Sequence, residues 1–204
     1  MRVVAIDGPV GSGKSTVAKA VAQRLALPML ETGAMYRAVT LAALRHGLDL
    51  GRQMAEVVAL AGALTVEVGE RVRLDGEDVT GELRNDDVNR AVSVVAAEPG
   101  VRSALVSQQR AWAEANGGGV VEGRDIGTVV FPDAAVKVFL TASVEERARR
   151  RGPDEDAAGL ARRDHLDSTR AMSPLVAAPD ALVIDSTTLT VDEIVEEIAA
   201  RWPG

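Results

Sequence analysis

The chain has 204 residues, a length that suits one large domain or a core with a modest insertion. Hydrophobic residues make up 47% and charged residues 26%, close to the globular average, so the composition excludes a wholly disordered chain. Acidic residues outnumber lysine and arginine by 30 to 23, and aromatic residues are only 2%. This balance disfavours a protein that holds nucleic acid by a general basic surface or by stacking rings.

The absence of cysteine excludes a disulfide scaffold and a thiolate metal site. No apolar run approaches the roughly 18 residues of a membrane span. Where a signal peptide would need an apolar run, the N-terminus carries Asp7 and a glycine-rich stretch. We therefore expect a soluble, cytoplasmic protein with no membrane partner. Since no coiled-coil seam or large apolar stripe demands assembly, we also expect a monomer.

Short apolar strands alternate with amphipathic helices along the chain. Met1–Ile6 is a β-branched apolar run, which is typical of a strand buried on both faces. Similar runs predict strands at Pro28–Glu31, Val120–Glu122, Val136–Leu140 and Leu182–Ile184. Helical spacing predicts helices at Thr16–Leu27, Ala34–His46, 51–63, Asn85–Ala97, Gly100–Ala115 and Val191–Arg201, with arginine-rich helices between the last two strands. This order indicates an α/β fold with a doubly wound parallel sheet.

A local β patch interrupts that alternation. Leu64–Val68 and Arg71–Asp75 alternate apolar and polar residues and are joined by Gly69-Glu70, which predicts a hairpin. Val79-Thr80 is the expected third strand. We interpret residues 64–82 as part of an insertion. The polar, acidic and alanine-rich stretch Gly152–Gly159 is expected to be a mobile loop.

The segment from Gly8 to Ser15 reads Gly-Pro-Val-Gly-Ser-Gly-Lys-Ser and matches G-x-x-x-x-G-K-[ST] between a buried strand and a helix. Its glycines allow backbone N–H groups to turn toward a phosphate, and Lys14 supplies a charge for the β- and γ-phosphates. The alternative is a turn that merely connects strand to helix. The predicted ATP-binding residues here are Gly8, Pro9, Val10, Gly11, Ser12, Gly13, Lys14, Ser15 and Thr16.

The same motif predicts a magnesium site. The Ser15 hydroxyl suits Mg²⁺, which is expected as the cofactor of a reaction that uses ATP. Asp7, which ends the first strand, can lie near the metal and contact it through water. It can equally cap the loop by accepting backbone N–H bonds, and the sequence leaves both roles open.

Arginines cluster far from this loop in the sequence. They are Arg147, Arg149, Arg150 and Arg151, followed by Arg162, Arg163 and Arg170. Phosphoryl transfer between two anions requires cations on both, so these segments favour an arginine-rich lid. The alternative is solvated helix faces paired with acids such as Glu145 and Glu146, which we favour for Arg149 and Arg150 taken singly. None of the three lysines follows asparagine, so the guanine-reading motif of GTPases is absent.

Three further segments give the chain a specific resemblance. Glu31–Arg37 reads Glu-Thr-Gly-Ala-Met-Tyr-Arg, Glu122–Ala134 contains Gly-Arg-Asp-Ile-Gly-Thr-Val-Val-Phe-Pro-Asp-Ala, and Arg163–Arg170 reads Arg-Asp-His-Leu-Asp-Ser-Thr-Arg. Together with Pro174-Leu175 and Asp185-Ser186-Thr187, these segments resemble bacterial cytidylate kinases over nearly the whole chain. The chain departs from the pattern at Glu31, which replaces an aspartate, at Leu166, and in a short lid stretch between Arg151 and Arg162.

The resemblance implies a role for each matching residue. In the acceptor site, the cytosine would be read by Ser93, Arg102 and Asp125, the phosphate would be bound by Arg37, Arg124 and Arg170, and the sugar would be contacted by Tyr36 and Asp167, with Thr32 in the same site. The transferring phosphoryl group would be acted on by Lys14 and Arg163, together with Asp167 and Arg170. Arg147 would reach ATP. The alternatives are ordinary packing for Tyr36, a helix-face serine at Ser93, and an ion pair between Arg124 and Asp125.

The resemblance also implies an architecture and a reaction. A core (about 1–31, 116–146 and 178–204) would carry a monophosphate-binding region with a small β-sheet (about 32–115) and a lid (about 147–171). The implied reaction transfers the γ-phosphoryl group of ATP to CMP or dCMP. The rival functions are another small P-loop kinase acting on AMP, UMP or shikimate, a catalytically silent nucleotide-binding scaffold, and an RNA-binding module.

Overall fold

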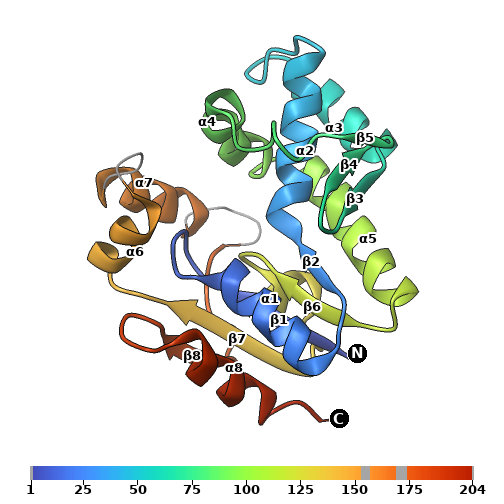
Figure 1. Cartoon of the computed structure of the whole chain (residues 1–204). Coiled ribbons are helices and arrows are strands. Elements are labelled where there is room, and N and C mark those ends of the chain that lie inside the picture. Colours follow the sequence, from blue (N-terminus) through green and yellow to red (C-terminus); the bar gives the residue numbers. More distant parts are fainter. Residues whose placement is uncertain (1, 153–156, 169–173, 204) are drawn as a thin grey trace. The chain divides into compact units, whose positions relative to one another are not determined.

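The computed structural model describes residues 2–152, 157–168 and 174–203 and divides into two compact units. The first unit comprises Met1–Leu30 and Trp112–Gly204, and the second comprises Glu31–Ala111. Within the described residues, five strands form the sheet of the first unit in the order β2-β6-β1-β7-β8 (Figure 1). Their bounds are β1 Val3–Asp7, β2 Met29–Glu31, β6 Gly119–Glu122, β7 Val136–Thr141 and β8 Leu182–Asp185. The pairs β1–β6, β1–β7 and β7–β8 are parallel.

Two helices cover one face of this sheet. α1 (Lys14–Leu25) and α8 (Val191–Ala199) pack against each other in front of the strands in Figure 1. Their apolar faces meet the sheet in a core that includes Ile6, Leu140 and Ile198, all fully buried. α8 begins with a capping box in which Thr190 and Glu193 satisfy each other's backbone N–H groups. The core therefore holds α1 firmly behind the glycine-rich loop that precedes it.

The last strand, β8, was predicted to be buried, but it is partly exposed. β8 lies at the edge of the sheet, and its exposure alternates along the strand, with Val183 59% exposed. An edge strand has a neighbour on one side only, so a short β-branched run does not require burial on both faces.

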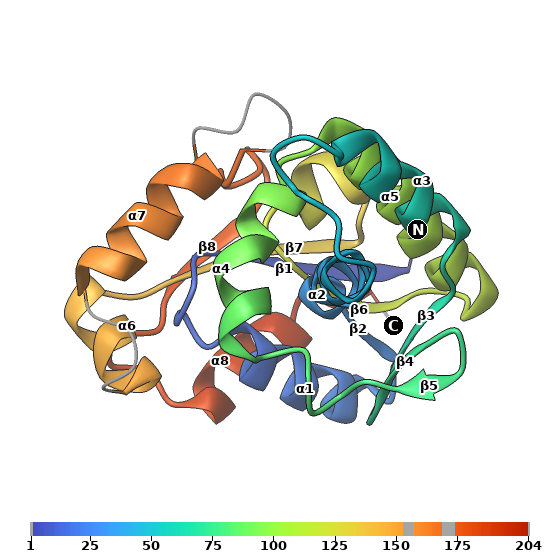
Figure 2. The ribbon, with the colours of Figure 1, turned by 90° about the horizontal axis from the view of Figure 1, so that it is seen from above.

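The remaining elements of the first unit are helical. α6 (Val144–Arg151) and α7 (Ala157–Ser168) pack side by side in both views (Figures 1 and 2). A five-residue π-helix, η1 (Ile126–Val130), follows β6, and the sequence had predicted no helix there. Of the loop expected over Gly152–Gly159, residues 153–156 lie outside the described part of the chain, and α7 begins within the predicted range at Ala157.

The second unit combines helices with a small antiparallel sheet. α2 (Thr32–Arg45) packs against α3 (Met54–Ala63) and α4 (Asp86–Val95), and Figure 2 looks nearly along α2. α5 (Pro99–Ala115) runs from this unit into the first. The described residues form three strands in the order β3-β4-β5, with bounds β3 Val66–Val68, β4 Val72–Leu74 and β5 Glu77–Asp78.

The predicted hairpin is confirmed, whereas the third strand was predicted two residues too late in the sequence. β3 pairs antiparallel with β4 as expected. The third strand is Glu77–Asp78 rather than Val79-Thr80, because Asp75 (φ 49°) and Gly76 (φ 86°) form a tight turn that brings Glu77 opposite Leu74. An Asp-Gly pair is a strong hairpin signal because both of its residues accept positive φ.

The parallel sheet with flanking helices and the separate small antiparallel sheet confirm the predicted α/β fold. Within the stretches that the structure describes, every helix is too short or too polar to span a bilayer.

Candidate active site

The glycine-rich loop joins β1 to α1 in a conformation that its glycines make possible. Gly8 (φ 148°) lies so close to β7 that a Cβ there would be 2.0 Å from the carbonyl oxygen of Leu140. Gly13 (φ 89°) is the N-cap of α1 and also adopts a left-handed conformation that favours glycine. The loop thus ends at the N-terminus of a twelve-residue helix, where backbone amides and the helix dipole favour an anion.

Lys14 is the cation of this loop. Its side chain is buried, and its Nζ donates a hydrogen bond to the carbonyl oxygen of Pro9 at 2.8 Å. Burial, followed by the nearby positive charge of Arg124, lowers the pKa of Lys14 from its ordinary value to about 7, although the carboxylates of Glu122, Asp7 and Asp167 act in the opposite direction. A phosphate group bound in the loop would supply the missing negative charge and restore full protonation of the amine.

Asp7 ties the end of β1 to the turn that follows β6. Its Oδ1 accepts from the backbone N–H of Ile126 and its Oδ2 from that of Gly127, each at 2.8 Å. Burial raises the pKa of Asp7 to about 6, although the two N–H bonds lower it. Of the two predicted roles, the carboxylate thus accepts backbone N–H bonds. The donors belong to η1, however, and not to the glycine-rich loop that the sequence predicted.

Arg124 and Asp167 form an ion pair between the β6 turn and α7. Arg124 Nε donates to Asp167 Oδ2 at 2.9 Å, and the side chain of Asp167 is 6% exposed. Arg124 thus pairs with an acid distant in sequence, Asp167. Asp125 is buried as the N-cap of η1, and its carbonyl oxygen accepts from the N–H of Val129 at 2.8 Å.

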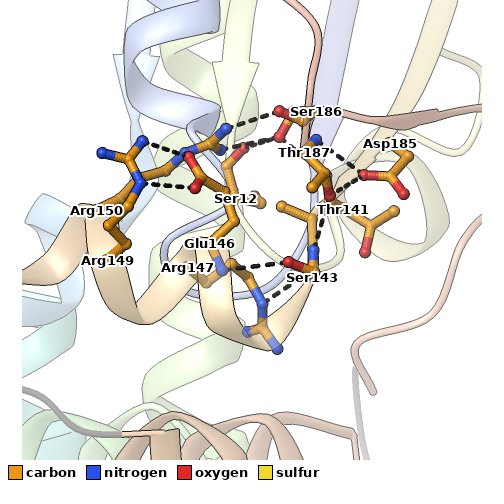
Figure 3. A network of polar contacts seen from close by, with 11 residues as sticks. Ser12, Thr141, Ser143, Glu146, Arg147, Arg149, Arg150, Asp185, Ser186 and Thr187 are labelled. Carbon is orange, nitrogen blue, oxygen red and sulfur yellow. Dashed lines mark hydrogen bonds and ion pairs between the residues drawn. The ribbon is translucent and has the colours of Figure 1, made fainter.

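α6 lies against the outer side of the glycine-rich loop (Figure 3). Buried Arg147 donates to the carbonyl oxygens of Val10 (3.1 Å) and Ala142 (3.2 Å), and forms an ion pair with Asp164 of α7 at 2.6 Å. Arg147, on α6, therefore contacts both the glycine-rich loop and α7. Its predicted contact with ATP remains a prediction.

The two neighbouring arginines differ from each other. Arg149 is 74% exposed and pairs with Glu146, as the solvated-face alternative predicts. Arg150 shares Glu146 but also donates two hydrogen bonds to Ser186, one to its hydroxyl oxygen and one to its carbonyl oxygen. Together these two arginines lower the pKa of Glu146 to about 2.

The second unit contains the other residues predicted to bind the acceptor. Tyr36 is buried on α2, and the guanidinium of Arg102, on α5, lies 5.5 Å from the centre of its ring. Arg102 Nη1 also donates to the carbonyl oxygen of Ala96 at 3.2 Å. A cation over an aromatic face is a favourable arrangement that fixes the guanidinium plane.

Arg37 is held by a different pair of acceptors. Its Nη1 donates to Asn89 Oδ1 at 2.7 Å and to the carbonyl oxygen of Leu83 at 3.0 Å. Ser93 is half-buried on α4, and Thr32 is buried at the first position of α2. Among the lid residues, the backbone of Arg163 belongs to α7 while its side chain lies outside what the structure describes, and Arg170 lies outside the described residues altogether.

The donor groups around the loop fit a nucleoside triphosphate with Mg²⁺. Ser15 presents its hydroxyl from an exposed position in the first turn of α1, close in sequence to Lys14. The Ser12 hydroxyl is buried and has no hydrogen-bond partner in the described part of the chain. Mg²⁺ usually takes one or two protein oxygens, with phosphate oxygens and water completing its coordination, so a single hydroxyl such as that of Ser15 can serve as the protein donor.

Three polar residues of this site are absent from the predicted site residues, and one of them, Arg150, was interpreted from the sequence as part of a solvated helix face. Glu122 is buried at the end of β6, opposite Ile6, and its charge acts on Lys14. Arg150 and Ser186 connect α6 with the loop after β8. A carboxylate at the end of an apolar strand signals Glu122, whereas nothing in the local sequence separates Arg150 from Arg149.

Comparison with known proteins decides the family. The model of the cytidylate kinase family matches residues 4–203. The cytidylate kinase of Mycolicibacterium paratuberculosis is 52% identical over 213 residues, which cover 96% of this chain and 92% of that protein. The chain belongs to the cytidylate kinase family. The cytidylate kinase of Pelotomaculum thermopropionicum is 50% identical over 215 residues, which cover 97% of this chain and 94% of that protein.

The family membership confirms the resemblance predicted from the motifs and makes the chain a kinase of this family. A solved structure of a gluconokinase from Sinorhizobium meliloti shares the fold, with a TM-score of 0.51 and 16% identity over 98% of this chain and 91% of the gluconokinase. At that identity the likeness concerns the fold alone, and it agrees with the α/β fold described above.

Proposed function

We propose that this kinase transfers the γ-phosphoryl group of ATP to the 5′-phosphate of CMP and of dCMP. A phosphate oxygen of the acceptor attacks the γ-phosphorus, the bond from that phosphorus to the β,γ-bridging oxygen breaks, and ADP leaves. The attacking oxygen is already anionic at neutral pH, so the reaction needs no strong general base. The protein contributes orientation and stabilisation of charge.

The convergence of charges around Lys14 carries this proposal. Within the first unit, Lys14 is close enough to Arg124 for one charge to alter the ionisation of the other. The cation of the donor loop and an arginine proposed for the acceptor phosphate therefore lie near each other. Two cations held together in a buried region disfavour each other unless anions neutralise both, and the two substrates would supply those anions.

The remaining roles combine the chemistry of the glycine-rich loop with those that the resemblance to cytidylate kinases implies. The amides of Gly8–Thr16, with Lys14 and Arg147, would hold the phosphates of ATP. Ser15 would hold Mg²⁺, with Asp7 contacting it through water, and the metal would neutralise charge on the phosphate oxygens when bound. Arg163 would stabilise the transferring group from the lid. For the acceptor, Arg37, Arg124 and Arg170 would bind the phosphate. Tyr36 and Asp167 would contact the sugar, and Thr32 would lie in the same substrate site. Ser93, Arg102 and Asp125 would contact the base.

Selection of cytosine would depend on Asp125. A carboxylate accepts hydrogen bonds from the exocyclic amine of cytosine, whereas uracil presents a carbonyl oxygen at that position. Arg102 would donate to the ring acceptors of the base. In this proposal the second unit is the monophosphate-binding region, and residues 147–171 form the lid over the core.

The test is a panel of acceptors with ATP and Mg²⁺, followed by ADP release. CMP and dCMP should be phosphorylated far faster than UMP, AMP, shikimate or gluconate. Faster turnover of any other acceptor would contradict the proposal, and no turnover at all would favour a silent scaffold. We further propose that the kinase acts as a monomer in the cytoplasm without nucleic acid or membrane, in keeping with its acidic balance. Sedimentation of the purified chain tests the monomer.

A further inference from the structure

Two carbonyl groups of the glycine-rich loop accept hydrogen bonds from side chains distant in sequence. The carbonyl oxygen of Val10 accepts from Arg147 Nη1 at 3.1 Å. The carbonyl oxygen of Ser12 accepts from the hydroxyl of Ser186 at 2.9 Å. Arg147 belongs to α6, and Ser186 follows β8, so two different elements hold alternate peptide groups of the loop.

The geometry of the peptide group gives these contacts a consequence for the phosphate site. In a trans peptide the carbonyl of one residue and the N–H of the next point in opposite directions. Holding the carbonyl of Val10 outward therefore turns the amide of Gly11 inward, and holding that of Ser12 does the same for Gly13. In the described part of the chain, neither amide donates a hydrogen bond to a protein group. Both are available to phosphate oxygens.

Ser186 is itself fixed in orientation by Arg150. The hydroxyl of Ser186 is buried and accepts from Arg150 Nη1 at 3.0 Å, while its carbonyl oxygen accepts from Nη2 at 2.7 Å. Because the arginine donates to the hydroxyl oxygen, the single proton of the hydroxyl is directed elsewhere, to the carbonyl oxygen of Ser12 or to that of Thr141 at 3.0 Å. Arg150 Nε donates to Glu146 at 2.8 Å, which completes its own set of acceptors.

Arg150 also lies beside the loop that it supports. A Cβ on Gly13 would be 3.5 Å from Arg150 Nη1, and a Cβ on Gly11 would be 3.0 Å from both the Cβ and the carbonyl oxygen of Arg147. α6 therefore backs the loop closely at both glycines. Arg149, the adjacent residue, also pairs with Glu146, but its side chain is 74% exposed.

We propose that Arg150 and Ser186 are positioning residues for the triphosphate of the nucleotide donor. Neither touches the phosphate; they act through the peptide that joins Ser12 to Gly13. The inference rests on the proposed function, in which ATP binds this loop. It predicts that loss of either residue weakens the binding of ATP and leaves the binding of CMP nearly unchanged, since the acceptor uses other residues.

The experiment compares Ser186→Ala, Arg150→Lys and Arg150→Ala with the control Arg149→Ala. Steady-state kinetics gives KM for ATP at saturating CMP and KM for CMP at saturating ATP, and calorimetry gives the affinity for a non-hydrolysable ATP analogue. Ser186→Ala and Arg150→Ala should each raise KM for ATP and weaken the analogue about tenfold, the expected cost of one buried hydrogen bond. KM for CMP should change less than twofold. Arg149→Ala should match the parent chain.

The double variant sharpens the test because the two residues act in series. If Arg150 works through Ser186, the double variant Arg150→Ala with Ser186→Ala should lose no more affinity for ATP than Ser186→Ala alone. Independent tenfold losses that multiply to about a hundredfold would overturn the serial arrangement.

Three outcomes separate the possible failures. Unchanged affinity for ATP in both Ser186→Ala and Arg150→Ala would overturn the inference. Equal increases of both KM values with a lower melting temperature would mean a structural role only and would also overturn it; Arg150→Lys, at a partly exposed position, guards against loss of folding in the alanine variants. If the parent chain fails to phosphorylate CMP with ATP, the proposed function fails, whereas an active parent with unaffected variants refutes only the positioning role.

Discussion

The donor loop and the acceptor residues of the second unit hold their cations by different means. In the first unit, the buried amine of Lys14 donates to the main-chain carbonyl of Pro9, and burial brings its pKa to about 7. In the second unit, Arg37 contacts an amide and a carbonyl, and Arg102 contacts a carbonyl and an aromatic face. An amine can lose its proton on burial, but a guanidinium stays charged. The donor site can therefore change its charge on binding, while the acceptor site has a fixed charge.

The two regions also differ in how their geometry is fixed. The donor loop depends on backbone conformation, since Gly8 and Gly13 have positive φ and α6 lies directly behind the loop. The acceptor residues depend on side-chain orientation from stable helices. Substitutions in the donor loop should therefore reduce turnover, and substitutions of acceptor residues should mainly alter affinity and specificity for the acceptor.

Lys14→Ala should have the largest effect and should test the donor side of this comparison. It removes the cation that stabilises charge on the transferring group, so kcat should fall about a thousandfold. Steady-state kinetics with ATP and CMP measures it, and Lys19→Ala, an exposed lysine of the same helix, is the matched control. A fall in kcat below tenfold would show that the amine is not required for the chemical step.

Arg124→Ala should have the next largest effect, on the acceptor. It removes a proposed phosphate contact and leaves the buried carboxylate of Asp167 without this partner, so KM for CMP should rise about a hundredfold. KM for ATP should change much less. Arg24→Ala, which breaks an exposed ion pair with Glu196, is the control. Equal increases of both KM values would contradict a role confined to the acceptor.

Asp125→Ala should change specificity rather than turnover. Loss of the carboxylate removes the acceptor for the cytosine amine, so the ratio of kcat/KM for CMP to that for UMP should narrow about tenfold. Measuring both acceptors on the same preparation gives the ratio, and Asp192→Ala, an exposed acid of α8, should leave it unchanged. An unaltered ratio in Asp125→Ala would remove this residue from the base site.

The smallest expected effect is a dependence of the affinity for ATP on pH. The unliganded pKa of Lys14 is about 7, and bound phosphate should raise it, so ATP binds the protonated amine best. Raising the pH from 7 to 8 should weaken the affinity for ATP about fivefold, because the free enzyme must then take up a proton. Calorimetry with the ATP analogue measures this slope. Lys14→Arg, which stays charged, should show none, and the same slope in that variant would contradict the assignment.

The sequence specifies the conformation of the glycine-rich loop more directly than that of the predicted acceptor residues because the loop motif is contiguous. Eight adjacent residues specify the loop, and the order of strands and helices predicts the sheet behind it. The supporting contacts of Arg150 and Ser186 join α6 to the loop after β8, so only the folded chain brings them together. The chain gives no local sign that Arg150 turns inward while Arg149 turns to solvent.

Local conformations explain the differences in the fold. Because Asp75 and Gly76 form the turn, the third strand of the small sheet begins two residues earlier than predicted, although an Asp-Gly pair is a turn signal visible in the sequence. η1 was not predicted because a helix of five residues is too short to show a hydrophobic period, and its first amides are satisfied by Asp7, distant in sequence. Exposure of β8 follows from its place at the edge of the sheet, which composition does not specify.

The most direct test of the account is a crystal structure of the chain with CMP and a non-hydrolysable ATP analogue bound together. We expect Lys14 Nζ to leave the carbonyl oxygen of Pro9 and contact the β- and γ-phosphates, while Arg37, Arg124 and Arg170 contact the phosphate of CMP in line with them. Guanidinium groups directed to solvent, with CMP bound elsewhere, would contradict the central claim that this chain brings two phosphates together for direct transfer.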